Sequence, residues 1–449
     1  MVGDRAFCRA GSIGDNGATS PHRELSADAY RVLAAVLVVV GHWLAASVSF
    51  RDGGFGNDNP LVGLPWTQGL TWIFQVVPVF FLVGGYASAA SWRRWCDEGG
   101  GSGADWVRRR LGAVLGPTSA YVAVVLVVVA VLAWAGVDGA QLGFATWAVA
   151  MHLWFIPVYL IVVSLTPAAV AAHRRWGLGV PAALAIAVAA VDAVALGGRV
   201  HQLGWANYVL CWAAVYQLGI AWHGGALRAW RPVLLAATAA VALTLLVGPG
   251  PYPVSMVGVA GAHIQNTSPP TVAMLTFAAA QAGLLIAAAP ALTHWLRRSR
   301  WRQALAVASK NVMALYLWHM VPVIVVALIG YPNGLLPQPE LGTSAWWLFR
   351  AAWVLILSAV TAAEMALLWL GQAVFRRALP TWTVPLPGWY APPLLVAGVG
   401  ITVLPLWRFA TDGFAPDGRF PVLAALLFAA GVGMLSLVPR AVKPASQRI

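Results

Sequence analysis

Charged side chains are scarce in this chain of 449 residues: Asp, Glu, Lys and Arg together make up 10%, whereas 60% of the residues are hydrophobic. Soluble globular domains carry about 25% charged residues, so the composition excludes an ordinary soluble globule. No long polar stretch follows the first 27 residues, which leaves no room for a separate soluble domain. Apolar runs of about 18 residues or more recur instead, and they predict an all-α, polytopic bundle of transmembrane helices.

Acidic side chains are the scarcer charged class, with 15 Asp and Glu against 28 Lys and Arg, which gives a net charge of +13. In a soluble protein this excess would suggest a nucleic-acid partner. In a membrane protein, arginines that fix topology and contact anionic lipid produce the same excess. We therefore expect membrane lipid as a partner and no nucleic acid, and nothing in the sequence predicts a protein partner.

Cysteine is also scarce, and Cys8, Cys96 and Cys211 show neither metal-ligand spacing nor the pattern of a disulfide framework. The chain shows no other metal-ligand constellation and no Ser-His-Asp motif, so we predict no metal site. The polar N-terminal stretch has no apolar segment ahead of a cleavage site and is not a signal peptide. We interpret residues 1–27 as a disordered cytoplasmic tail.

The apolar runs predict twelve membrane spans, at 29–49, 70–92, 113–136, 152–171, 178–197, 206–222, 231–248, 271–292, 311–331, 346–369, 391–407 and 420–438. With the N-terminus in the cytoplasm, 22 Lys and Arg fall in inner segments and 4 in outer ones, and the other two of the 28, Arg31 and Arg350, lie within spans. This asymmetry follows the positive-inside rule and predicts that both termini are cytoplasmic. Residues 28–370 then form the main membrane domain, 371–440 two additional transmembrane helices, and 441–449 a cytoplasmic tail.

The segment 249–270 is uncharged but rich in Pro and Gly. Irregular backbone exposed to lipid is not tolerated at membrane depth. We therefore place this segment on the outer side, as a loop or a partly re-entrant plug.

Two ionisable residues, Arg31 and His42, bound an otherwise apolar run of Val, Leu, Ala and Gly. Eleven helical steps of about 100° bring them to the same face and separate them by roughly 16 Å along the axis. Asp28 lies on the same stripe, three residues before Arg31, where it can hold the guanidinium. Ionisable groups inside a membrane helix are costly and usually functional. A histidine that is merely hydrogen-bonded across a helix interface is the structural alternative for His42.

Further candidates lie in three other places. Arg108, Arg109 and Arg110 fix topology and also suit a polyphosphate ligand, because Arg binds phosphate bidentately. Asn311 and His319 share a helical face, and Tyr316 pairs with His319 at i,i+3, so a second imidazole lies near the depth of His42. An interfacial aromatic belt with a histidine whose hydrogen bonds are satisfied is the alternative there.

Asp192 and Arg350 lie near outer helix ends, either as ordinary helix-end residues or as the lining of an acceptor pocket.

Together these motifs resemble the integral-membrane acyltransferases of family 3, which include bacterial sugar O-acetyltransferases and antibiotic-modifying acyltransferases. The first helix has the family's spacing of Arg, ten residues and His. The segment 78–86 reads P-V-F-F-L-V-G-G-Y, with Gly84 where serine is common; 153–157 reads L-W-F-I-P and contains Trp154; and 314–319 reads A-L-Y-L-W-H. The resemblance covers roughly residues 26–370. It departs from the family at Ala113, which occupies the second place of an Arg-x-x-Arg pair that begins at Arg110.

The resemblance implies a ten-helix acyltransferase core followed by two added helices, and a multi-pass enzyme in the cell membrane. It implies transfer of an acetyl or other short acyl group from acyl-CoA to a hydroxyl of a sugar, lipid or secondary metabolite, with no tightly bound cofactor and acyl-CoA as co-substrate. We expect a site with His42 as general base together with Arg31, and donor binding by Arg108, Arg109 and Arg110. We expect a supporting or acceptor pocket formed by Asp28, Trp154, Asn311, Tyr316, His319, Asp192 and Arg350. Direct transfer and an acylated intermediate both remain open.

Two other functions fit a polar site in a membrane bundle. The first is a transporter or flippase for a polar or lipid-linked solute, which would also need buried charges near the midplane. The absence of internal repeats argues against it. The second is an inactive relative that acts as a membrane sensor, for which Ala113 and Gly84 are the hints.

Overall fold

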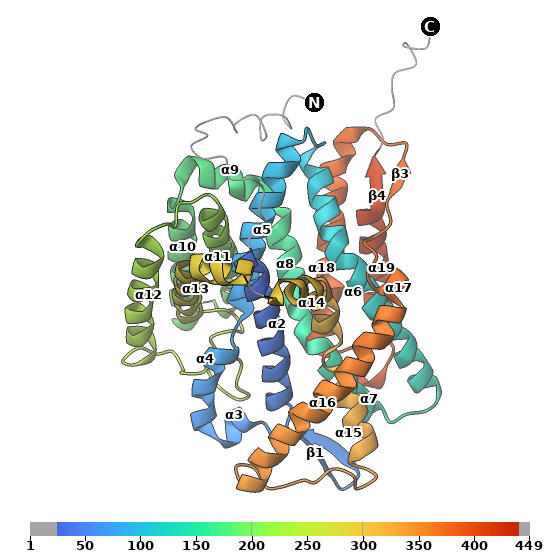
Figure 1. The fold of residues 1–449 in the computed structure, drawn as a ribbon. Coiled ribbons are helices and arrows are strands. Elements are labelled where there is room, and N and C mark those ends of the chain that lie inside the picture. Colours follow the sequence, from blue (N-terminus) through green and yellow to red (C-terminus); the bar gives the residue numbers. More distant parts are fainter. Residues whose placement is uncertain (1–24, 199, 299, 440–449) are drawn as a thin grey trace.

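The computed structural model describes residues 25–198, 200–298 and 300–439 (Figure 1). The first part of the chain forms α2 (Leu25–Ala45), β1 (Val48–Arg51), β2 (Gly54–Asn57), α3 (Pro60–Gly63), η1 (Pro65–Leu70), α4 (Thr71–Phe74), α5 (Val77–Asp97), α6 (Gly103–Trp134), α7 (Gly139–Ala150), η2 (Met151–Trp154), α8 (Phe155–Ser164) and α9 (Thr166–Trp176). The middle forms α10 (Gly179–Leu196), η3 (His201–Ala206), α11 (Asn207–His223), α12 (Arg231–Val247), α13 (Val272–Arg298), α14 (Trp301–Trp318) and α15 (Val321–Gly330). The last part forms α16 (Ser344–Leu370), α17 (Gln372–Phe375), β3 (Trp382–Val384), η4 (Gly388–Tyr390), α18 (Ala391–Asp412), η5 (Pro416–Gly418), α19 (Val422–Ser436) and β4 (Leu437–Pro439).

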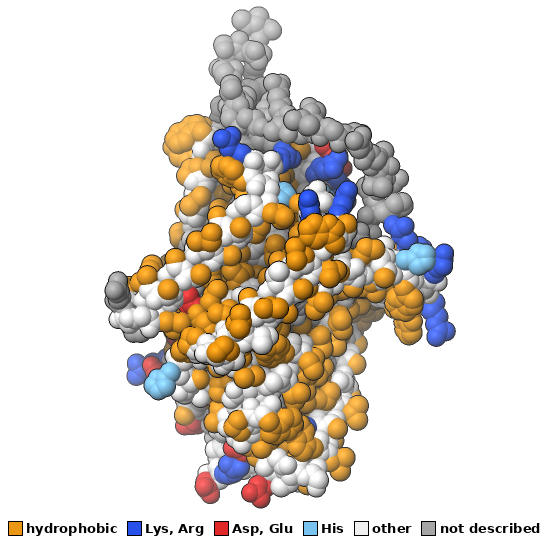
Figure 2. All heavy atoms as spheres, turned by 90° about the vertical axis from the view of Figure 1, so that its left-hand side faces the viewer, with side chains coloured by type: hydrophobic (Ala, Val, Ile, Leu, Met, Phe, Trp, Pro, Cys, Tyr) orange, Lys and Arg blue, Asp and Glu red, His pale blue; other side chains and the backbone are white. Residues whose placement is uncertain are grey.

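Eight helical segments of the described chain are long and apolar enough to cross a membrane: Leu25–Ala45, Pro65–Asp97, Gly103–Trp134, Gly139–Ser164, Gly179–Leu196, Val272–Arg298, Ser344–Leu370 and Gly388–Asp412. The pair α14 and α15, bent by 51° at the break between them, makes a ninth. The face in Figure 2 is covered mostly by hydrophobic side chains, and its Lys and Arg side chains gather mainly at the upper end and along the right-hand edge. The chain is a polytopic helical membrane protein.

Three of the twelve predicted spans correspond to short helices. The helices α11 and α12 have 17 residues each, and α19 has 15. At about 1.5 Å per residue they are roughly 23–26 Å long, somewhat less than the hydrocarbon thickness of about 30 Å. The structure thus contains eight or nine helical segments long enough to span the membrane, and the count of twelve stays a prediction.

The fourth predicted span, 152–171, is wrong in its boundaries. The helical segment starts earlier, at Gly139, because the Asp138 side chain accepts a hydrogen bond from the Gln141 amide and caps α7. It ends at Ser164, where Pro167 occupies one of the first two positions of the separate helix α9. Proline has no amide hydrogen and favours a helix start over a helix interior.

Two minor expectations also need correction. The all-α class holds except for two small sheets, an antiparallel pair of β1 with β2 and a parallel pair of β3 with β4. Cys211 is free and buried, but Cys96 is disulfide-bonded. The sequence did not predict this bond, because spacing along the chain does not report proximity in space. Most of the predicted N-terminal tail and residues 441–449 lie outside the described residues.

The irregular segment 249–270 packs into the fold as a loop. The Trp72 indole and the Gln75 amide, just before α5, donate to the carbonyl oxygens of Val254 and Met256. Within the loop, the buried Asn266 amide donates to the Pro253 and Ser255 carbonyl oxygens. These bonds satisfy backbone groups that lack a helical partner, as buried irregular backbone requires.

The helix α2 lies at the centre of the arrangement that positions the site. It packs against α5, α13, α14 and α16, so its polar stripe faces other helices (Figure 1). The helices α5 and α11 approach each other closely. A Cβ atom on Gly85 or on Gly219 would overlap a carbonyl oxygen of the facing helix, so only glycine permits this approach.

Candidate functional site

Two imidazoles meet between α2 and the end of α14. The Nδ1 atom of His42 lies 2.8 Å from the Nε2 atom of His319, and the rings stack with their centroids 5.1 Å apart. His319 is fully buried, whereas His42 is partly exposed. The Trp43 indole N–H donates to the His319 carbonyl oxygen at 2.8 Å, which fixes α2 to the break between α14 and α15. The structure thus brings together the two histidines that the sequence placed at similar depth.

A third imidazole, His152, belongs to the same cluster and was missed in the sequence. It is 2% exposed and lies in η2, with its ring centroid 4.8 Å from that of His319. The Tyr316 hydroxyl donates to the His152 carbonyl oxygen, so the predicted Tyr316 also belongs here. An ionisable residue directly before the L-W-F-I-P segment, inside an apolar run, was the available signal.

The stripe of Asp28 and Arg31 forms as the spacing predicts. The Arg31 guanidinium lies 3.1 Å from the Asp28 carboxylate and 3.5 Å from the Ser309 carbonyl oxygen. It therefore links α2 to α14, and the structure shows no direct contact with His42. Any role of Arg31 in chemistry would rest on a bound substrate or on the placement of α2.

A basic pocket of about 410 Å³ opens between the end of α5 and the start of α6. We call this the basic pocket; it is lined by Ser91, Arg94, Trp95, Glu98, Trp106, Arg109, Arg110 and Ala113. The Arg109 guanidinium lies over the Trp95 ring, 4.6 Å from its centroid, and an Arg110 nitrogen lies 3.5 Å from the Ser88 hydroxyl. Arg94, which comes from α5, was not among the predicted residues. His42 does not line this pocket.

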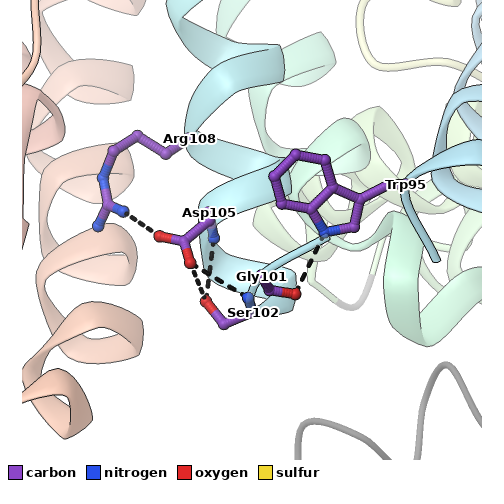
Figure 3. Close-up of polar contacts among 5 residues, drawn as sticks. All are labelled: Trp95, Gly101, Ser102, Asp105 and Arg108. Carbon is purple, nitrogen blue, oxygen red and sulfur yellow. Dashed lines mark hydrogen bonds and ion pairs between the residues drawn. The ribbon is translucent and has the colours of Figure 1, made fainter. Parts of the chain in front are cut away.

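Arg108 does not line the basic pocket, so the structure brings together only two of the three predicted arginines there, and their role in donor binding stays a prediction. The Arg108 side chain is 5% exposed and pairs with Asp105 at 3.3 Å. Figure 3 shows the Arg108 and Trp95 side chains lying on opposite sides of the start of α6, with the Ser102–Asp105 capping box between them. The physical reason is helical geometry, because consecutive residues point about 100° apart.

Trp154 and Asn311 contact other parts of the molecule. The Trp154 ring packs against Tyr208 and Trp212. The Asn311 side chain accepts a hydrogen bond from Arg376 and donates to the Val307 carbonyl oxygen. Asn311 thus bonds to the residue just after the end of α17, although it lies on α14, the helix that ends next to His319.

Asp192 and Arg350 are both buried and belong to separate environments. The Asp192 carboxylate accepts hydrogen bonds of 2.8 Å from the Tyr252 hydroxyl and the Val272 amide, so it ties the loop 249–270 to α10 and α13. The Arg350 guanidinium donates to the Ala46 carbonyl oxygen, just beyond the end of α2. Aromatic rings surround Arg350, those of Trp346, Phe349 and Trp353. The two residues do not contact each other, and their place in an acceptor pocket stays a prediction.

Within the described part of the chain, no group of three or more His, Cys, Asp or Glu side chains has the arrangement to hold a metal ion. The three imidazoles contact one another through a hydrogen bond and ring packing. Their chemistry is that of proton acceptors and donors.

Comparison with known proteins gives one match. A family model described as an acyltransferase domain matches residues 24–369. No curated protein and no solved structure matches this chain. The matched range contains the three histidines, the basic pocket and the stripe of Asp28 and Arg31, and it ends before α18 and α19.

Proposed function

This chain belongs to acyltransferase family 3 and is a membrane-bound acyltransferase, and we propose that it moves a short acyl group from acyl-CoA to a hydroxyl of a sugar, lipid or secondary metabolite. The observation that carries this proposal is the hydrogen-bonded pair of His42 and His319 inside the helix bundle. A partly exposed imidazole held by a buried one is a suitable general base for an alcohol.

In the proposed reaction the acceptor hydroxyl oxygen attacks the carbonyl carbon of the thioester, and its proton passes to His42. A new C–O ester bond forms and the C–S bond breaks. The same proton then passes from His42 to the CoA thiolate, which leaves as the thiol. Each turnover converts one thioester and one alcohol to one ester and one thiol, and needs no further reactant. An acylated intermediate remains the alternative route.

The basic pocket supports binding of the donor. Arg94, Arg109 and Arg110 offer guanidinium groups that can hold the phosphates of acyl-CoA. Ala113, at the second position of the family's arginine pair, lines the same pocket, so Arg94 supplies a cation where the expected arginine is missing. By the positive-inside rule this end of α5 and α6 lies in the cytoplasm, where acyl-CoA is found.

The remaining features of the proposal follow from this orientation. The chain would cross the cell membrane twelve times with both termini in the cytoplasm, and the last two helices would be an addition to the acyltransferase core. Acyl-CoA would be a co-substrate, with no tightly bound cofactor. The acceptor would reach His42 from the outer side past the loop 249–270, or from the lipid.

The test is acyl transfer by purified, folded protein from radiolabelled acetyl-CoA to an extract of lipids and glycans from the cells that carry the gene. His42→Ala should lower the transfer rate by at least about 100-fold, the usual contribution of a general base. The matched control is His294→Ala, because His294 is an exposed histidine on α13.

Full activity of His42→Ala would remove His42 from the mechanism. Uptake of a polar solute into proteoliposomes without acetyl-CoA, together with no transfer by the unmodified protein, would favour a transporter instead.

A further inference from the structure

The hydrogen bonds around His319 run in one direction. Its Nδ1 atom lies 2.8 Å from the Tyr316 carbonyl oxygen, and a carbonyl oxygen can only accept, so Nδ1 carries the hydrogen. In a neutral imidazole the other nitrogen, Nε2, then has the lone pair. Because Nε2 lies 2.8 Å from the Nδ1 atom of His42, His42 must donate through Nδ1. The Nε2 atom of His42 keeps a free lone pair.

The neutral form of His319 follows from its surroundings. The side chain is fully buried, and no carboxylate of the described residues forms an ion pair with it. Burying an unpaired charge costs far more free energy than burying a neutral imidazole. A positive charge on His319 would also repel the positive charge that His42 acquires when it accepts the proton.

We infer that His319 is a positioning residue for the proposed reaction: it fixes the tautomer of His42 so that Nε2 is the atom that takes the acceptor's proton. This inference rests on the proposed function. Which nitrogen of a histidine is basic is set by the hydrogen bond that the other nitrogen makes. His319 performs for His42 the orienting function that a carboxylate performs in a Ser-His-Asp triad.

The break between α14 and α15 makes this arrangement possible. α14 ends at Trp318, so the Tyr316 carbonyl is among the last four of the helix, which lack an intrahelical donor. His319 Nδ1 supplies that donor. The Trp43 indole holds the His319 backbone and the His152 ring packs against its side chain, so the imidazole is held on several sides.

The consequence for the reaction is that no ring has to turn. When Nε2 of His42 accepts the hydroxyl proton, the ring becomes cationic, and its Nδ1–H continues to donate to His319. When Nε2 gives the proton to the departing thiolate sulfur, the starting tautomer returns. His319 neither gains nor loses a proton at any step.

The test compares His319→Gln with His319→Leu in the full-length protein. Gln keeps an oxygen that can accept from His42 Nδ1, whereas Leu has similar bulk and no acceptor. We expect Leu to lower kcat by about 100-fold and Gln by less than about 10-fold, with KM for acetyl-CoA within about threefold of the unmodified protein in both. Loss of packing alone would affect the two variants alike.

A second readout does not depend on activity. Nitrogen NMR of histidine-labelled protein in nanodiscs should show His42 with a protonated Nδ1 and an unprotonated Nε2, the signals being assigned by their absence in His42→Asn. His319→Leu should turn this single tautomer into a mixture.

The outcomes separate this inference from the proposed function. An unprotonated Nδ1 at His42, or full kcat in His319→Leu while His42→Ala is inactive, would overturn the positioning role and leave the transferase intact. Full activity of His42→Ala would overturn the proposed function instead. If His319→Leu does not fold, the Gln variant and the tautomer of the unmodified protein decide the question.

Discussion

Arg108 and Arg109 are adjacent in the sequence, but their guanidinium groups lie in different environments. Arg108 is buried and pairs with Asp105 (Figure 3). Arg109 lies over the Trp95 ring in the basic pocket. A helix of 3.6 residues per turn sends neighbouring side chains to different faces. The two arginines should therefore respond to substitution in different ways.

Loss of a pocket arginine should weaken donor binding. We expect Arg94→Ala and Arg109→Ala each to raise the Kd for acetyl-CoA by about 10- to 100-fold, because a hydrogen bond to a charged group contributes about 1.5–3 kcal/mol. Isothermal titration of acetyl-CoA into the purified protein measures this. The control is Arg108→Met, which should leave the Kd within about twofold. Equal weakening by all three substitutions would show that Arg108 also reaches the donor.

Much of the fold was predictable because its signals are local. Uninterrupted apolar runs identified the helices, and the Pro and Gly of 249–270 identified an irregular segment. The fourth span was misplaced because helix caps decide its ends: Asp138 starts the helical segment early, and Pro167 begins a new helix. Apolarity alone does not distinguish 139–151 from an interfacial stretch.

The site was predictable where one helix carries the information. The spacing of Asp28, Arg31 and His42 on α2 gave both the ion pair and the shared stripe. Contacts between helices were harder to infer. Equal depth suggested the approach of His319 to His42. Asp192 and Arg350 were also placed at a common depth, but they have different partners, because depth does not specify which helices are neighbours.

Asp192 should matter for stability more than for transfer. Asp192→Ala leaves the Tyr252 hydroxyl and the Val272 amide without their acceptor, so we expect a loss of about 2–3 kcal/mol in the free energy of unfolding. Asp192→Asn keeps one acceptor oxygen and should lose less than half as much. Chemical unfolding in detergent measures both. Acetyl transfer by the Asn variant should stay within about threefold of the unmodified protein; abolished transfer at unchanged stability would place Asp192 in the acceptor pocket.

The contact between α5 and α11 should tolerate no added carbon atom. A Cβ atom on Gly85 would overlap the Tyr216 carbonyl oxygen, and one on Gly219 would overlap the Leu82 carbonyl oxygen. Both obstacles are backbone atoms, so the helices themselves would have to separate. Small residues permit such close packing in membrane helices. Because α5 also forms one wall of the basic pocket, we expect Gly85→Ala to lower the free energy of unfolding by about 3 kcal/mol, the upper end for overpacking, and to weaken acetyl-CoA binding.

The matched control is Gly400→Ala on α18, where an added Cβ atom has no neighbour within 4 Å. Ala favours a helix over Gly by about 0.8–1.0 kcal/mol, so this variant should be as stable as the unmodified protein or more so. The two substitutions add the same methyl group to a helix, and only the packing differs. Opposite signs in thermal unfolding would locate the cost at the α5–α11 contact, whereas equal stability of Gly85→Ala and the unmodified protein would mean that the two helices lie farther apart than described.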